Sequence, residues 1–172
     1  LRKIQEHAKP HLKWALEVAF QTGLRCGESE LFAVTFEAVD WNRQNLSVYA
    51  TKTKTWRTVP LSKEFMGALK AKQGEHVSGR IVEYKGKPVR SMKKALQKAC
   101  DAAGITYPVT FYDVRHLFAT TLLQRGADPM SVAKVMGHAS TRMTLDQYGH
   151  AMESEMRRAI GLLSQSETVE SL

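Results

Sequence analysis

The spacing of apolar residues along the chain predicts a series of short amphipathic helices. In residues 11–21, apolar side chains recur at the i, i+3, i+4 and i+7 positions of a helix with one buried face, and Gly23 stands where such a helix would end. The same apolar spacing, with capping residues or glycines at the ends of most segments, predicts helices over residues 62–73, 91–103, 111–125, 129–136, 141–148 and 152–163. A further helix is predicted directly after Arg25, with Glu28 and Glu30 near its start.

Between residues 38 and 61 the apolar period changes to two, which predicts antiparallel strands. Val39 and Trp41 mark the first strand, residues 46–50 form the second and residues 58–61 the third. Residues 74–88 are predicted to be a basic loop. Together these elements predict a mainly α-helical domain with a small antiparallel β-sheet, of the α+β class.

Composition limits what such a domain can do. At 172 residues and 43% apolar content, the chain is long enough for one domain with its own core. The net charge of +8 favours a polyanionic partner such as nucleic acid, although an evenly solvated basic surface would give the same total. The two distant cysteines indicate reduced thiols in the cytoplasm, and no apolar run reaches the ~18 residues of a membrane span. Because the chain begins with Leu1, we expect it to be a fragment of a longer protein.

Four side chains near helix ends suit phosphate chemistry: Arg25, Arg115, His138 and Tyr148. A guanidinium offers a planar fork of donors to phosphate oxygens and stays charged where water is excluded. A phenol has a pKa of about 10, so it is a poor nucleophile unless cationic neighbours favour the phenolate. A phosphodiester formed with a tyrosine would conserve the energy of the broken bond and allow rejoining without ATP.

Each of these side chains also has a purely structural interpretation. The arginines could form surface ion pairs, His138 could cap a helix, and Tyr148 could pack in the core. His116 faces a stretch of apolar helix, which favours a core or supporting role over catalysis. The combination of these residues, more than any one of them, favours phosphate chemistry.

Four segments in chain order, TGLRCGESEL, TKTKTWRTVPL, DVRHLFAT and VMGHASTRMTLDQYGH, resemble the conserved boxes of the tyrosine recombinase (phage integrase) family, specifically its catalytic domain. The similarity covers roughly residues 12–151. The resemblance implies the DNA breaking-rejoining fold and cleavage of DNA through a covalent 3′-phosphotyrosyl intermediate. It also implies that no metal or cofactor takes part.

Residue roles follow from the resemblance position by position. Arg25 and Arg115 match the two arginines that clamp the scissile phosphate. His138 matches the histidine that hydrogen-bonds the phosphate, and Tyr148 matches the nucleophile.

The other matched positions are less uniform. Lys52, on an exposed hairpin, resembles the lysine that protonates the leaving 5′-oxygen, and Lys54 is the alternative because hairpin alignments slip by two residues. Glu28 resembles the acidic residue that supports the site, and His116 is assigned a supporting role. Tyr112 stands where the family usually has a histidine regarded as the proton acceptor from the nucleophile. Tyrosine can hydrogen-bond a phosphate but is a weaker base near neutral pH.

The sequence therefore predicts a site-specific DNA recombinase catalytic domain, an integrase of a phage or other mobile element, over residues 1–164, followed by a polar tail over residues 165–172. The expected partners are double-stranded DNA, three further copies in a homo-tetramer on paired sites, and DNA-bending accessory proteins, with no membrane. An upstream DNA-clamping domain, which the resemblance implies, is expected to be missing from this chain. Two alternatives remain open. A non-catalytic helix-turn-helix module over residues 128–148 would bind DNA without cutting it, and a type IB topoisomerase-like enzyme would relax supercoils without paired sites.

Overall fold

A computed structural model describes residues 1–51, 53–138, 140–149, 157 and 160–161. Its helices are α1 (Arg2–His7), α2 (Pro10–Thr22), α3 (Lys63–Gln73), α4 (Lys93–Ala102), α5 (Phe111–Gln124), α6 (Pro129–Met136) and α7 (Thr141–Tyr148), with a 3-10 turn η1 (Phe36–Ala38). Its strands are β1 (Val39–Asp40), β2 (Asn45–Ala50), β3 (Thr55–Pro60), β4 (Glu83–Tyr84) and β5 (Lys87–Pro88). The predicted α+β class is confirmed.

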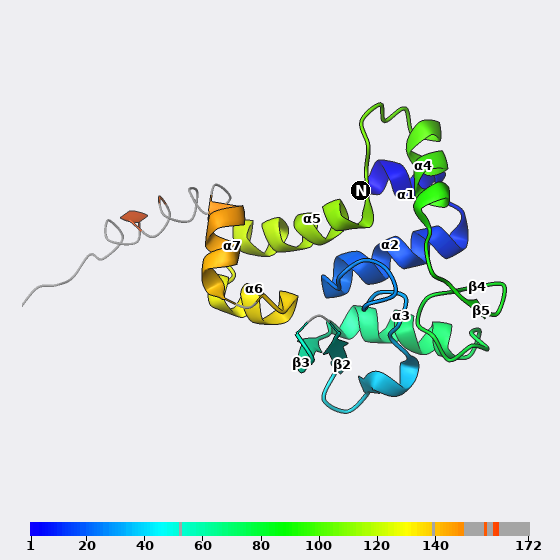
Figure 1. Cartoon of the computed structure of the whole chain (residues 1–172), viewed down its shortest axis with the longest axis horizontal. Helices are drawn as coiled ribbons and strands as arrows, with labels where there is room; N and C mark the ends of the chain where they lie inside the picture. The colour runs from blue at the N-terminus through cyan, green and yellow to red at the C-terminus, as the bar shows by residue number, and fades with distance from the viewer. Residues whose placement is uncertain (52, 139, 150–156, 158–159, 162–172) are drawn as a thin grey trace, which may run out of the picture.

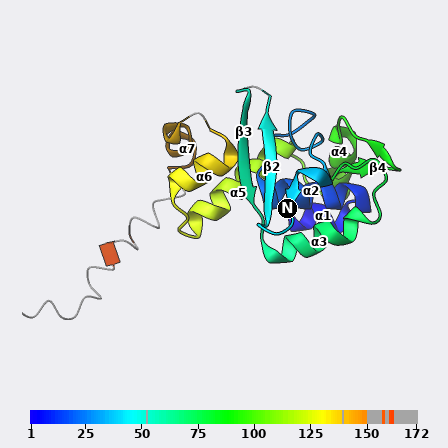
Figure 2. The same ribbon diagram turned by 90° about the horizontal axis from the view of Figure 1, so that it is seen from below.

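The three-stranded sheet has the order β1-β2-β3 and is antiparallel throughout. Leu46 pairs with Val59 and Val48 with Arg57, so these four side chains share the face that turns toward the core. Strand β3 begins at Thr55, three residues earlier than predicted, which places Arg57 in phase with buried Val59. Figure 2 shows β2 and β3 standing between α3 on one side and α6 on the other.

Two sets of apolar side chains hold the helices together. Helices α2 and α5 pack against each other inside the main core, which also takes in α3, α4 and the sheet. A second, smaller cluster joins the C-terminal half of α5 to α6 and α7, and consists of Phe118, Ala119, Leu123, Val132, Met136 and Tyr148. In Figure 1, α6 and α7 accordingly lie at one end of α5, far from α1 and α4.

Side-chain caps mark the start of three of the described helices. The Ser62 hydroxyl accepts the backbone N–H of Phe65 at the start of α3, and Thr110 forms a reciprocal capping box with Asp113 at the start of α5. Asp128 caps α6 by accepting from the backbone N–H of Ser131. Helix α4 begins one residue later than predicted, with Met92 rather than Ser91 at the N-cap position.

The predicted helix after Arg25 is wrong, because residues 26–33 form a series of turns. The Glu30 carboxylate turns back to accept the backbone N–H of Arg25 at 2.8 Å, and the backbone N–H of Leu31 reaches the Arg25 carbonyl at 3.0 Å. Gly27 permits this path with φ of 88°. The segment therefore folds around its own carboxylate instead of continuing the helical ladder.

Two other differences concern short elements. Helix α1 was not predicted, and residues 74–88, predicted to be loop, contain the β4–β5 hairpin. Its two-residue turn, Lys85-Gly86, has positive φ at both positions, as tight hairpin turns require, but strands of two residues are too short to show a period. The predicted helix over residues 152–163 lies almost wholly outside the described residues.

Gly23 and Gly104 offer a matched test of packing at helix ends. Both have positive φ, but a methyl group at Gly23 would lie 2.4 Å from Cδ1 of Phe118, whereas one at Gly104 meets nothing within 4 Å. Gly104→Ala should therefore lower the free energy of unfolding by only about 1–2 kcal/mol, the penalty for placing alanine in a left-handed backbone conformation. Gly23→Ala should lower the free energy of unfolding by about 1–3 kcal/mol more, because the added methyl group overpacks the contact with Phe118. Urea denaturation of the two variants measures the difference, and equal losses would contradict the predicted clash.

Candidate active site

Two guanidiniums contact one buried carboxylate beside the C-terminal end of α6, and a third guanidinium lies at the same helix end. Glu30 is 1% exposed and receives a bidentate pair from Arg57, with Nη1 to Oε1 at 2.8 Å and Nη2 to Oε2 at 2.6 Å. Arg25 Nη1 lies 3.6 Å from Glu30 Oε1. Arg115, the third arginine, is 3% exposed and projects from α5. These four residues are called the arginine cluster below.

The same arginines bind three successive carbonyls at the C-terminal end of α6. Arg57 Nε donates to Val135 at 2.8 Å, Arg115 Nη2 to Met136 at 2.6 Å, and Arg25 Nη2 to Gly137 at 2.7 Å. The last carbonyls of a helix have no partner within the helix and carry its partial negative charge. The guanidiniums supply the missing donors, which fixes both the arginines and the end of α6.

The arginine cluster has an excess of positive charge, because three guanidiniums face one carboxylate. Burial raises the pKa of Glu30, but the hydrogen bonds from Arg57 and from the Arg25 backbone outweigh it, so this pKa lies below its ordinary value. Burial lowers the pKa of Arg115 to about 10, which still leaves its guanidinium charged at neutral pH. The cluster is therefore suited to an oxyanion such as a phosphate.

His138 follows the left-handed Gly137 directly, so the end of α6 places its ring beside the cluster. Its Nδ1 lies 2.8 Å from the Thr144 hydroxyl of α7. Burial, together with Arg115 and Arg25, lowers the pKa of His138 to about 4. The imidazole is thus neutral at pH 7 and can offer one N–H to a ligand.

This lowered pKa predicts how stability depends on pH. The unfolded chain binds a proton at His138 near pH 6.5, whereas the folded protein resists it down to about pH 4. Stability supplied by neutral His138 is therefore complete above pH 6.5 and is lost progressively as the pH falls toward 4. His138→Gln should make the free energy of unfolding less dependent on pH in this window. Denaturant titrations of the wild-type chain and of this variant at several pH values compare the two slopes.

Tyr148 ends α7 with its ring in the smaller hydrophobic cluster and only 2% of its surface exposed. Its hydroxyl lies 2.8 Å from Nδ1 of His116 on α5. Burial raises the pKa of the Tyr148 phenol to about 12, against the opposing effect of Arg115. The phenol is therefore fully protonated near neutral pH and would need to lose its proton in order to attack.

Tyr112 occupies a different position from Tyr148. It is 50% exposed, its ring lies edge-on to His116 with centroids 4.2 Å apart, and its hydroxyl is 3.4 Å from the Gln147 amide. The described hydrogen bonds give it no contact with the Tyr148 hydroxyl. Tyr112 therefore borders the pair formed by His116 and Tyr148.

The structure brings several of the predicted residues together but places Glu28 apart from them. Arg25, Arg115 and His138 converge, whereas Glu28 is exposed and pairs with Arg90 at 3.2 Å. Glu30 is the carboxylate that contacts the arginines, because the turns after Arg25 direct position 30 inward. The supporting role assigned to Glu28 stays a prediction, and the carboxylate that the structure places against the arginines lies two residues later.

Sequence reasoning missed Arg57 altogether. If the third strand had been predicted to begin at Thr55, the period of two would have placed Arg57 on the same inward face as Val59. The sequence therefore did contain a signal for Arg57. Lys52 lies outside the described residues, and Lys54 is exposed in the β2–β3 turn with φ of 53°. The role predicted for a hairpin lysine stays a prediction.

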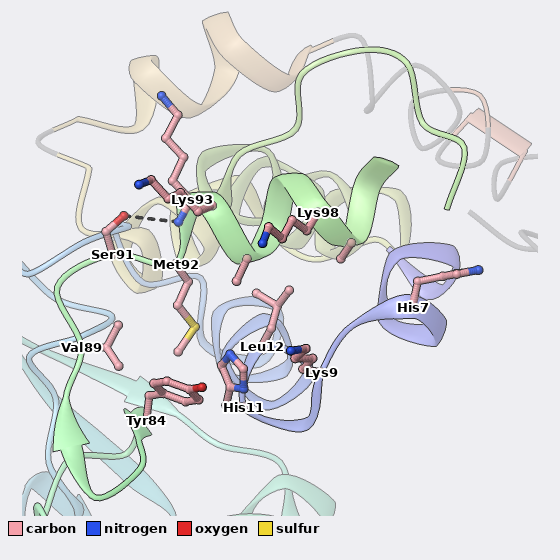
Figure 3. A pocket seen from close by; sticks show the side chains of 13 residues that line it. His7, Lys9, His11, Leu12, Tyr84, Val89, Ser91, Met92, Lys93 and Lys98 are labelled. Atoms are coloured by element: carbon pink, nitrogen blue, oxygen red, sulfur yellow. Dashed lines mark hydrogen bonds between the residues drawn. The ribbon is translucent and has the colours of Figure 1, made fainter. Parts of the chain in front are cut away.

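A separate cavity of about 770 Å³ lies between α1, α2, α4 and β4. Figure 3 shows Tyr84 beside His11, at a centroid distance of 4.3 Å, with Leu12 and Met92 among the apolar lining and lysines around it. No residue of this cavity belongs to the arginine cluster, so it is not part of the candidate active site.

Two further properties concern the described residues alone. None of their helices is long and apolar enough to cross a membrane. No three of their histidine, cysteine, aspartate and glutamate side chains gather as a metal ion would require.

The arrangement of helices around the small sheet is that of tyrosine recombinase catalytic domains. The catalytic domain of bacteriophage HP1 integrase matches with a TM-score of 0.68 at 22% identity, over 93% of this chain and 89% of that one. The Tn1549 transposon integrase matches with a TM-score of 0.75 at 19% identity, over 95% of this chain and 63% of that one. These likenesses establish the fold.

The sequence places the chain more narrowly: it belongs to the phage integrase family, whose model matches residues 1–155. The ICEBs1 integrase of Bacillus subtilis is 27% identical over 168 residues, which cover 81% of this chain and 45% of that protein. A XerC-like tyrosine recombinase of Caldanaerobacter subterraneus is 27% identical over 206 residues, covering 95% and 52%. The chain spans about half the length of these curated relatives.

Proposed function

We propose that this chain is the catalytic domain of a site-specific DNA recombinase, an integrase of a phage or other mobile element, with Tyr148 as its nucleophile. The observation that carries the proposal is the arginine cluster, where fixed guanidiniums gather at the C-terminal end of α6, the helix before the one that ends in Tyr148. A phosphodiester bound there would meet donors that are already oriented, so little reorganisation remains for the reaction.

The proposed reaction has two balanced steps. The Tyr148 oxygen attacks phosphorus, the bond from phosphorus to the 5′-oxygen breaks, and a 3′-phosphotyrosyl bond replaces it. Arg25 and Arg115 bind the non-bridging oxygens of the phosphate. Lys52 donates a proton to the leaving 5′-oxygen. In the second step a 5′-hydroxyl attacks the phosphotyrosyl bond and releases Tyr148, so the DNA is rejoined without ATP.

The proposed partner is double-stranded DNA, bound by a tetramer of the whole protein on paired sites, with DNA-bending accessory proteins. Two related proteins support this partner. One solved structure is the Tn1549 transposon integrase in complex with transposon right end DNA, and another is a crystal structure of a lambda integrase fragment as a dimer bound to a COC′ core site. The net charge of +8 is consistent with a DNA partner, because neutralised phosphates release counterions.

Covalent trapping tests the function directly. The chain is incubated with a pool of nicked duplexes of randomised sequence, and adducts that survive a denaturing gel are recovered and sequenced. A recombinase domain should give adducts enriched in one sequence. Salt-sensitive binding to the pool without any adduct would instead favour the helix-turn-helix module, for which α6, Gly137 and α7 supply two short helices and a turn.

A further inference from the structure

The Tyr148 hydroxyl and the His116 imidazole form a hydrogen-bonded pair across two helices. His116 Nδ1 lies 2.8 Å from the Tyr148 oxygen, a distance that suits direct proton transfer. His116 extends from α5 next to Arg115, and Tyr148 ends α7, so the packing of the smaller hydrophobic cluster fixes the pair. The nucleophile is thus in contact with a titratable group before DNA binds.

No equivalent contact exists at the position where the resemblance led us to expect the base. Tyr112 stands there, and its hydroxyl lies near the Gln147 amide instead of the Tyr148 hydroxyl. A phenol is also a poor proton acceptor at neutral pH, because its conjugate acid forms only in strong acid. The proton of Tyr148 therefore needs another acceptor.

We propose that His116 is that acceptor, a catalytic base that takes the phenol proton as Tyr148 attacks phosphorus. The inference rests on the proposed function, since it assigns one step of that reaction. The proton passes from the Tyr148 oxygen to His116 Nδ1 while the bond from oxygen to phosphorus forms. On rejoining, the imidazolium returns the same proton to the departing phenolate, so no other reactant is needed.

The role requires neutral His116 to carry its proton on Nε2, leaving the Nδ1 lone pair for the phenol. Nε2 lies 3.5 Å from the Gln147 side-chain amide. A half-turn of that amide places its oxygen toward Nε2, where it accepts the ring N–H and stabilises this tautomer. Gln147 is then a positioning residue for the base.

The surroundings keep the imidazole unprotonated. The titratable or charged groups around it are Tyr112, Asp113 and Arg115 on its own helix, Tyr148 on α7, and His138 before α7. Burial lowers the pKa of His116 below its ordinary value, Arg115 acts in the same direction, and Asp113 opposes both. Because the Tyr148 pKa is about 12, transfer in the resting protein is unfavourable, so the proton moves only as bond formation makes the phenol more acidic.

Nitrogen NMR of the histidine-labelled chain tests the geometry without DNA. Neutral His116 should show a protonated Nε2 and an unprotonated Nδ1, and Tyr148→Phe should raise its pKa because the hydrogen bond to the neutral ring is lost. Tyr112→Phe is the matched control and should leave the tautomer unchanged. A proton on Nδ1, donated to the Tyr148 oxygen, would overturn the proposal.

Single-turnover cleavage of a duplex sequence recovered in the covalent-trapping experiment tests the chemistry. The wild-type rate should fall about tenfold per pH unit below the His116 pKa found by NMR. His116→Asn, which keeps a polar group near Nδ1 but cannot take a proton, should lower the rate by about 10²–10⁴-fold and lose that acid limb, with unchanged DNA binding. A rate within about threefold of wild type would reduce His116 to a positioning residue. Absence of any wild-type adduct would contradict the proposed function itself. If adducts form but neutral His116 carries its proton on Nδ1, only the role of His116 as the base is contradicted.

Discussion

Tyr148→Phe is expected to abolish the covalent protein–DNA adduct while leaving the fold in place. Phenylalanine keeps the buried ring in the smaller hydrophobic cluster, so the substitution removes only the hydroxyl and its hydrogen bond to His116. The stability change should stay near the ~1 kcal/mol of one hydrogen bond. The adduct, by contrast, cannot form without the attacking oxygen. A denaturing gel measures the adduct, and urea denaturation measures the fold.

Tyr112→Phe is the natural control, because Tyr112 is the other phenol near the site. Tyr112 is half-exposed and its hydroxyl lies 3.4 Å from the Gln147 amide, so loss of the hydroxyl should leave adduct formation intact. Adducts that persist in Tyr148→Phe but vanish in Tyr112→Phe would assign the nucleophile to Tyr112. Salt-sensitive DNA binding should be the same in both variants, because neither change alters charge.

Glu30→Gln is expected to lower the free energy of unfolding by about 3–5 kcal/mol, the usual effect of removing one partner of a buried ion pair. Glu30 is 1% exposed and accepts hydrogen bonds from both Nη atoms of the Arg57 guanidinium. Glutamine has nearly the same shape, but it leaves the charges of Arg57 and Arg25 without their counter-ion at a buried position. Urea denaturation at pH 7 measures the loss.

Glu28→Gln is the matched substitution two residues earlier. Glu28 is exposed and its ion pair with Arg90 is solvated, so the expected change is within about 0.5 kcal/mol. Similar losses for the two variants would mean that Glu30 is not the carboxylate that balances the cluster. A larger loss for Glu28→Gln would restore the assignment made from the spacing of the motif.

Much of the fold could be predicted because its signals are local. Helices α2, α3 and α6 have regular apolar spacing, and Gly23, Ser62 and Asp128 end or begin them through contacts within a few residues. The turns after Arg25 could not be predicted in this way. Their shape depends on Glu30 being held by Arg57, a residue 27 positions away that arrives on a strand.

The site shows the same division between local and distant contacts. Motif spacing identified Arg25, Arg115 and His138, which the structure brings together, and it selected Tyr148 over Tyr112. The resemblance to the family assigned the supporting carboxylate to Glu28, whereas the carboxylate that contacts the arginines is that of Glu30. The pairing of His116 with Tyr148 joins residues 32 positions apart, and only the packing of α5 against α7 brings them together.

The bonds between the arginines and the end of α6 have a mechanical consequence. Arg25 and Arg115 are the candidate phosphate ligands, and together with Arg57 they are also the polar attachments that hold α6, and through it α7, to the rest of the domain. Loosening one guanidinium would therefore let the segment that carries the tyrosine drift as well as weaken the anion site. An inactive arginine variant would then report a sum of two defects, and hydrogen exchange in α6 and α7 would be the way to separate them.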